Sequence, residues 1–309
     1  MRRLAVALLA ALIVIPVVLA VPAAAGVTGM TPQQAVNEGA AQAADAQGVT
    51  TYAAVVDRRT GTVVGKTDNA DTQVASESLV KVLLAAYYLV KYNGDLPENI
   101  SSDLHTMIVE SDDALCSAYW TNAAVPAMAE RFDLEGVALA DDPGHWGATK
   151  VTAIGMAEFL YRMSKDKVVG PWLVATMTES HDHGSDGFDQ NFGFNALDGA
   201  ASKQGWGSDN DWHEQQNAVH SIGLTTNYAA AVLQTGSSGV YKSMRPLATV
   251  TAQLIADSTP PAVPTPTKIP PSTKTPTTTK SRTPTSPSSP SEQPGVGGST
   301  SWWARAVEF

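Results

Sequence analysis

The chain of 309 residues, 43% of them hydrophobic, is long enough to bury a sizeable core in one or two domains, and its composition is not that of a membrane-embedded bundle. Its formal net charge is −10, and residues 4–256 alone carry −14. Such an acidic body argues against nucleic acid as a partner.

The first 25 residues follow the plan of a secretory signal. Arg2 and Arg3 precede an apolar run over residues 4–21, and small residues follow up to Ala25. We expect a signal peptide over 1–25, cleavage near Ala25 and a secreted, extracellular protein. The alternative is a retained membrane anchor, because the apolar run is long enough to span a bilayer. No cysteine follows the run, so a lipid-modified N-terminus is not expected.

A helix and a hairpin are expected next. Thr31 is a typical helix cap and Pro32 suits the first turn, so a helix should run from there to Gly48. Two alternating runs, residues 51–56 and 62–66, flank a turn that contains glycine, and this pattern predicts an antiparallel hairpin.

The stretch after the hairpin carries the most distinctive chemistry. Ser78 and Lys81 stand three residues apart at the start of a strongly apolar helix, which places both side chains on one helix face. The lysine amine can therefore reach the serine hydroxyl, and N–H groups of the first turn can help to hold developing negative charge. The spacing alone is weak, because Ser164 and Lys167 repeat it where a helix runs into a loop.

Apolar residues recur three and four apart from residue 96 to residue 180, which indicates helices. The helices expected there cover residues 102–110, 114–120, 125–132, 152–163 and 168–178. Three strands should follow, over residues 199–206, 217–225 and 228–234, and then a last helix over 240–256. This order predicts an α+β sandwich, in which a five-stranded antiparallel sheet is flanked by terminal helices and an all-helical subdomain is inserted between strands 2 and 3.

The composition changes sharply after Ser258. Eleven of the 19 prolines lie between residues 260 and 294, among threonine, serine and lysine. Such a stretch cannot bury a core, so residues 259–309 are expected to form a disordered tail, like a wall-spanning or O-glycosylated stalk. Its aromatic end, Trp302 to Phe309, could contact a membrane, the cell wall or a glycan, although a frayed terminus is the commoner outcome. The globular domain is then expected over residues 26–258.

The cysteine and the histidines do not predict a metal or redox site. Cys116, the only cysteine, cannot form an intramolecular disulfide and stands among apolar residues, so it should be a buried small hydrophobe. One loop crowds four possible ligands, His181, His183, Asp186 and Asp189. No second ligand cluster at a familiar spacing accompanies them, so neither a metal nor a cofactor is expected.

Three short motifs occur in one order along the chain, each on an expected element. Ser78-Leu-Val-Lys81 opens the apolar helix, Ser111-Asp112-Asp113 lies in the helical region, and Lys203-Gln204-Gly205 lies on the third strand. Together they resemble the nucleophile motif, the Ser-Asp-Asn loop and the Lys-Thr-Gly strand of the penicillin-recognising serine hydrolases, and the class A β-lactamases most closely. The likeness runs from about residue 51 to 256. A literal Ser-Asp-Asn at 208–210 lies on the strand side, where it could not face the nucleophile.

The resemblance implies a role for each matched residue. Ser78 would attack a carbonyl carbon and become acylated, while Lys81, if neutral, or a water linked to it would accept the proton. Ser111 would relay a proton to the leaving nitrogen, and Lys203 would attract a substrate carboxylate and keep the Ser111 region electropositive. The backbone N–H groups of Ser78 and Trp206 would form the oxyanion hole. The substrate-binding positions would be Asp113, Gln204, Gly205 and Trp206.

Two matched positions depart from the family pattern. Asp113 stands where the family has asparagine, so a group that donates and accepts is replaced by one that only accepts. Beside Lys81, its charge would favour the protonated amine, which is a poorer base. Gln204 replaces a threonine, a milder change because an amide can still bond a carboxylate. Lys203 could instead be an ordinary strand lysine.

The gravest departure is an absence. Between the second motif and the next long helix, class A enzymes carry a long loop with a glutamate that activates the deacylating water. Here the interval is short, and Glu130 and Glu135 lack the surrounding pattern, so an acyl-enzyme should persist. His145 and Trp146 could line the cleft where that loop would be. For both His145 and His220, a histidine bonded to the backbone is the default expectation.

These observations favour a secreted serine hydrolase of the β-lactamase type, acylated on Ser78, that turns over β-lactams slowly or acts on a cell-wall peptide or ester. Its partner would be a β-lactam or a small peptidoglycan-derived substrate, and we expect a monomer. The alternative, motivated by Asp113 and the missing glutamate, is a catalytically silent wall-associated binding module with the same fold.

Overall fold

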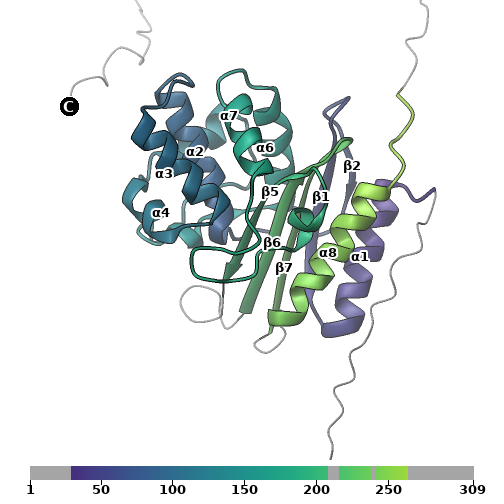
Figure 1. Cartoon of the computed structure of the whole chain (residues 1–309). Helices are drawn as coiled ribbons and strands as arrows, with labels where there is room; N and C mark the ends of the chain where they lie inside the picture. The colour runs from purple at the N-terminus through teal and green to yellow at the C-terminus, as the bar shows by residue number, and fades with distance from the viewer. Residues whose placement is uncertain (1–28, 208–215, 238–240, 264–309) are drawn as a thin grey trace, which may run out of the picture. The chain divides into compact units, whose positions relative to one another are not determined.

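The computed structural model describes residues 29–207, 216–237 and 241–263. Within them, five antiparallel strands form one sheet in the order β2-β1-β7-β6-β5 (Figure 1). The strands are β1 (Thr50–Asp57), β2 (Val63–Lys66), β5 (Ala201–Gly207), β6 (Gln216–Leu224) and β7 (Tyr228–Ser237). This is the predicted sheet, and the strand boundaries lie close to the predicted ones.

Helices cover both faces of this sheet. α1 (Pro32–Gln47) and α8 (Tyr241–Asp257) lie side by side on one face (Figure 1). The other helices come between β2 and β5 in the chain, and they are α2 (Val80–Lys91), α3 (Glu98–Val109), α4 (Asp113–Tyr119), α5 (Ala124–Arg131), α6 (Ala153–Lys165) and α7 (Gly170–Thr178). The prediction of an α+β fold with terminal helices flanking the sheet is thereby confirmed.

Side chains that alternate along the strands give the sheet two apolar faces. On β1, Ala53 and Val55 pack in the cluster under α1 and α8, whereas Ala54 and Val56 pack in the cluster shared with α2 and α6. The first helix begins as predicted, because Thr31 caps it and closes a capping box. The sheet is therefore a central layer between two hydrophobic cores.

A second, two-stranded sheet was not predicted. β3 (Val74–Ala75) pairs antiparallel with β4 (Lys150–Val151), and each strand is too short to show a period of two. Directly after β3, the N–H of Ser76 donates to Thr149 O at 2.7 Å. These bonds fix the entry to the 3₁₀ turn η1 (Glu77–Leu79), which contains the expected nucleophile.

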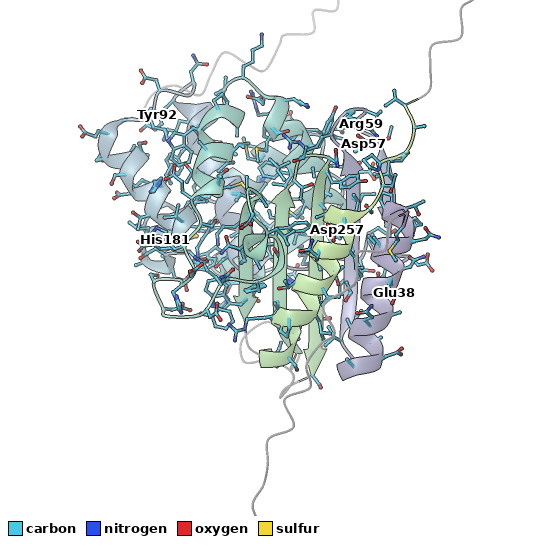
Figure 2. The ribbon with its side chains drawn as sticks, turned by 45° about the vertical axis from the view of Figure 1, so that its right-hand side comes forward. Glu38, Asp57, Arg59, Tyr92, His181 and Asp257 are labelled. Atoms are coloured by element: carbon cyan, nitrogen blue, oxygen red, sulfur yellow. The ribbon has the colours of Figure 1, made fainter. Side chains whose placement is uncertain are left out.

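The end of the described chain is tied back to the sheet. Just after β1, Arg59 pairs with Asp57 at 2.5 Å (Figure 2), and its hydrogen bond holds the pKa of the Asp57 carboxyl below its ordinary value. Arg59 also donates to Pro261 O at 2.8 Å, and the N–H of Thr259 donates to Met30 O at 2.8 Å. The first residues of the segment expected as a tail therefore make hydrogen bonds to the domain.

Several sequence predictions concern residues outside the described ranges. They are the signal peptide over 1–25, the tail beyond residue 263 and the second Ser-Asp-Asn triplet at 208–210. These stay predictions. In the part of the chain that is described, no helix is both long enough and apolar enough to cross a membrane.

Candidate active site

Ser78 and Lys81 meet where η1 leads into α2. The Ser78 Oγ lies 2.7 Å from Lys81 Nζ. Both groups are sheltered from water, since Ser78 is 6% exposed and the Lys81 side chain 0%. A hydroxyl held against an amine is the arrangement that activation of a serine nucleophile requires.

The backbone that presents Ser78 is strained and pressed against the sheet. Glu77 has a φ of 49°, a left-handed conformation that costs about 1–3 kcal/mol for a residue with a side chain. A Cβ at Gly205 would lie 3.0 Å from Ser76 O and 3.2 Å from Ser78 N, so a larger residue would require the backbone around Ser78 to shift by a few tenths of an ångström. The N–H of Ser78 therefore lies against the β5 backbone beside Trp206, where the oxyanion hole is expected.

Ser111 approaches the same lysine from the helical region. It lies two residues before α4 and has a φ of 55°. Its carbonyl oxygen lies 2.7 Å from Lys81 Nζ, and its Oγ lies 3.4 Å from the same atom. Asp112 caps α4 by accepting a hydrogen bond from the N–H of Leu115 at 2.8 Å, which fixes the turn that carries Ser111.

Lys203 completes the cluster from β5. Its Nζ lies 2.8 Å from Ser111 Oγ and 2.8 Å from Gln204 O, and its side chain is fully buried. Burial lowers the pKa of Lys203 well below its ordinary value, and the nearby charge of Lys81 lowers it further. The charged form of Lys203 is therefore less favourable here than for a lysine in water, and the predicted attraction of a substrate carboxylate stays a prediction.

Asp113 is the carboxylate of the site. As the first residue of α4, it places Oδ1 2.6 Å from Lys81 Nζ, while its side chain remains 68% exposed. Lys81 thus contacts three oxygens within 2.7 Å, one each from Ser78, Ser111 and Asp113. The structure brings the four predicted catalytic side chains and this carboxylate into one cluster.

The side chains of Gln204 and Trp206 make no hydrogen bond to the cluster around Ser78 within the described residues. Gln204 is fully buried, and neither atom of its side-chain amide has a hydrogen-bond partner among the described residues. Trp206 stacks on Phe188 with ring centroids 4.6 Å apart, and its Nε1 donates to Asp186 Oδ2 at 3.1 Å. Neither side chain is hydrogen-bonded to Ser78 within the described structure, so their part in substrate binding stays a prediction.

Trp146 lies in the short interval where the class A glutamate loop is missing and where the sequence predicted that this residue could line the cleft. The short turn η2 (Trp146–Ala148) places the indole ring centroid 4.8 Å from Lys81 Nζ, within the range of a cation–π contact. The side chains of Glu130 and Glu135 are exposed, and Asp113 is the one carboxylate paired with Lys81 across the described ranges. A tryptophan in a short loop carries no pattern that predicts its contact with the amine.

His220 contacts backbone atoms close to the Ser78 turn. It is fully buried on β6, with Nε2 3.0 Å from Ala75 O, and its Nδ1 accepts from the N–H of Gln234 at 3.2 Å. The predicted bonding to backbone is confirmed, and the ring ties β6 to the strand that enters the Ser78 turn. For His145, the Nδ1 lies 3.6 Å from a side chain, the carboxylate of Asp142.

Three of the four side chains weighed as metal ligands have other partners. His181 Nδ1 lies 3.5 Å from Glu110 Oε1, Asp186 accepts from an indole N–H, and Asp189 pairs with Arg245 at 2.7 Å. His181 lies on the helical side of the molecule, away from α1 and α8 (Figure 2). Among the residues with described positions, no group of three or more His, Cys, Asp or Glu could hold a metal ion.

Cys116 is a buried free thiol within α4, as predicted. Burial raises the pKa of this thiol to about 12, although the charge of Lys81 opposes the shift. The group therefore stays protonated at neutral pH and packs as a small hydrophobe.

The fold is that of the class A serine β-lactamases. The crystal structure of TLA-3 extended-spectrum β-lactamase matches with a TM-score of 0.58 at 14% identity, covering 73% of this chain and 98% of that chain. A class A β-lactamase from Bacteroides cellulosilyticus matches with 0.58 at 15% identity, covering 74% and 98%. A β-lactamase from Streptosporangium roseum matches with 0.56 at 14% identity, covering 72% and 97%. At these identities the likeness establishes the fold alone.

Relatives found by sequence carry a different description. The chain is 31% identical over 193 residues to the protein called "Putative lipoprotein LppW" in Mycobacterium bovis and Mycobacterium tuberculosis. The match covers 56% of this chain and 58% of that protein, so the chain spans less than two thirds of the length of these curated relatives. No known family profile matches the sequence.

Proposed function

We propose that the chain is an exported serine hydrolase of the β-lactamase type, acylated on Ser78 by β-lactams or by a cell-wall peptide or ester. One observation carries the proposal. Ser78 Oγ lies 2.7 Å from Lys81 Nζ, inside a buried cluster that includes the hydroxyl of Ser111 and the amine of Lys203.

Acylation follows from the chemistry of this cluster. Ser78 Oγ attacks the carbonyl carbon, and its proton passes to the uncharged form of Lys81. Ser111, which contacts both amines, delivers a proton to the leaving nitrogen. The N–H groups of Ser78 and Trp206 hold the developing oxyanion. The bond to the leaving nitrogen then breaks, and the acyl group remains on the serine.

Hydrolysis of the acyl-enzyme should be slow. Release needs a base that activates water, and the short interval that lacks the family's glutamate supplies Trp146, whose ring lies against Lys81. Asp113 is the one carboxylate paired with this lysine across the described ranges, and its Oδ1 is engaged by that amine at 2.6 Å. We therefore propose an enzyme in which acylation is faster than deacylation.

Two features support the proposal that the protein is exported. Residues 1–25 follow the plan of a secretory signal, and the relatives described as lipoproteins suggest a place at the cell envelope. No cysteine lies directly after the apolar run, and we propose that contacts of the Pro-rich tail with the wall or a glycan hold the protein there.

The direct test is mass spectrometry after incubation with benzylpenicillin. We expect the intact mass to rise by one penicillin, the modified peptide to contain Ser78, and the adduct to survive removal of free drug. Heat-denatured protein is the control for nonspecific acylation of surface amines. If the native protein gains no mass on Ser78 and hydrolyses no penicillin, the proposed function is wrong.

Replacing Trp146 by alanine should shorten the life of the adduct. Loss of the ring opens the side of Lys81 to water, and we expect the acyl group to leave several-fold faster, while a cation–π contact worth about 0.5–2 kcal/mol is lost. The measurement is the adduct's half-life by intact mass. Trp172→Ala is the matched control, since Trp172 bonds Ser101 on α3. An unchanged half-life would show that Trp146 does not protect the acyl group.

A second candidate function is a silent binding module with the same fold. The ion pair between Asp113 and Lys81 at 2.6 Å favours it, because this contact holds the amine that would otherwise act only on the serine hydroxyl. This alternative expects Ser78→Ala to leave ligand binding unchanged and no adduct to form on the native protein.

A further inference from the structure

The carboxylate of Asp113 has hydrogen-bond acceptor positions that no residue of the described cluster occupies. An ionised carboxylate has two oxygens with about four lone-pair positions, and Lys81 occupies only one of them, on Oδ1. No hydrogen bond to Oδ2 is formed within the described residues, and the side chain is 68% exposed. Lys81, in contrast, already contacts three oxygens within 2.7 Å. The spare capacity for a ligand therefore belongs to Asp113.

The carboxylate of Asp113 is close to the reacting atom. Ser78 Oγ and Asp113 Oδ1 contact Lys81 Nζ at 2.7 and 2.6 Å, so the distance between these two oxygens is at most the sum of the two contacts. In an aminoacyl group bound for attack, the α-nitrogen is two bonds from the carbonyl carbon, or about 2.5 Å. An α-nitrogen on the α4 side of the carbonyl can therefore reach the Asp113 carboxylate to form a hydrogen bond.

The chemistry of that contact selects the substrate. A carboxylate attracts an ammonium group, and the charge-assisted bond is short and strong. An N-acylated substrate has at this nitrogen only a neutral N–H, which makes a weaker bond than an ammonium group, and it adds a carbonyl oxygen, an acceptor to which a carboxylate cannot donate. An asparagine could donate to such a carbonyl, but Asp113 cannot.

We propose that the acyl donor of this enzyme carries a free α-ammonium group, as in an aminoacyl ester or amide, and that Asp113 selects it. The inference rests on the proposed acylation of Ser78. In the step, the Ser78 Oγ bonds the carbonyl carbon, the bond to the leaving alcohol or amine breaks, and the serine proton ends on that leaving group. Water later releases the free amino acid and restores the serine.

The test compares alanine p-nitroanilide with its N-acetyl derivative, each as the D and L form. For the native protein, we expect release of p-nitroaniline with a kcat/KM at least about tenfold higher for the free amine. The preference should fade as the pH rises through about 8, where an α-amino group loses its charge. Asp113→Asn should abolish or reverse the preference. Asp112→Asn is the matched control, because asparagine also caps a helix and this residue contacts Leu115.

Each outcome has a defined meaning. Equal rates on the two anilides, or a preference that survives in Asp113→Asn, would overturn the inference. If benzylpenicillin acylates Ser78 but neither anilide reacts, the inference is wrong and the proposed function stands. If no compound acylates Ser78, both are wrong.

Discussion

Ser78→Ala should remove the penicillin adduct entirely. The serine hydroxyl is the one group that would carry the acyl chain, and no methyl group can replace it. We expect the acylation rate to fall at least about a thousandfold, to the level of the heat-denatured protein. The measurement is intact mass after a time course with benzylpenicillin, followed by peptide mapping.

The chain contains its own control for this experiment. Ser164 has the same spacing to Lys167, but its Oγ donates to Tyr161 O at 2.7 Å and α6 ends at Lys165 between the two residues. Ser164→Ala should therefore leave the adduct unchanged. An adduct that persists at full yield in Ser78→Ala would place the reactive group elsewhere and end the proposed mechanism.

The fold was predictable because its signals are local and repeated. Short, nearly continuous buried runs along β1 and β7 are typical of central strands covered on both faces, and Thr31 with Pro32 marks the start of α1. The boundary of α3 was less certain, since it begins at Glu98, four residues before the predicted start. The paired segments at Val74 and Lys150 have no pattern of their own, because they are strands only through each other.

Some features of the site could likewise be predicted from the sequence, and others could not. The order of the motifs sufficed to place Ser78, Lys81 and Ser111 together, because each motif sits on an element whose position the fold dictates. Two properties depend on the surroundings of a side chain and could not be predicted. The pKa of Lys203 is lowered by burial, and Trp146 meets Lys81 through a loop without regular structure.

Lys81→Met should slow acylation of Ser78 by roughly a thousandfold, within the range of about 10²–10⁴ that a positioned base contributes. Methionine keeps most of the volume of the buried chain but cannot accept a proton. The carbonyl of Ser111 loses a partner, at a cost of about 1–3 kcal/mol, while exposed Asp113 can turn to water. Acylation is followed by mass spectrometry and folding by thermal unfolding.

Lys91→Met is the control on the same helix, because Lys91 is exposed at the far end of α2. We expect its acylation rate to match that of the native protein. A positioned base must change the rate when it is removed. A Lys81→Met acylation rate within a few-fold of the native one would show that Lys81 is not the base, and a large loss would assign the proton transfer to Lys81.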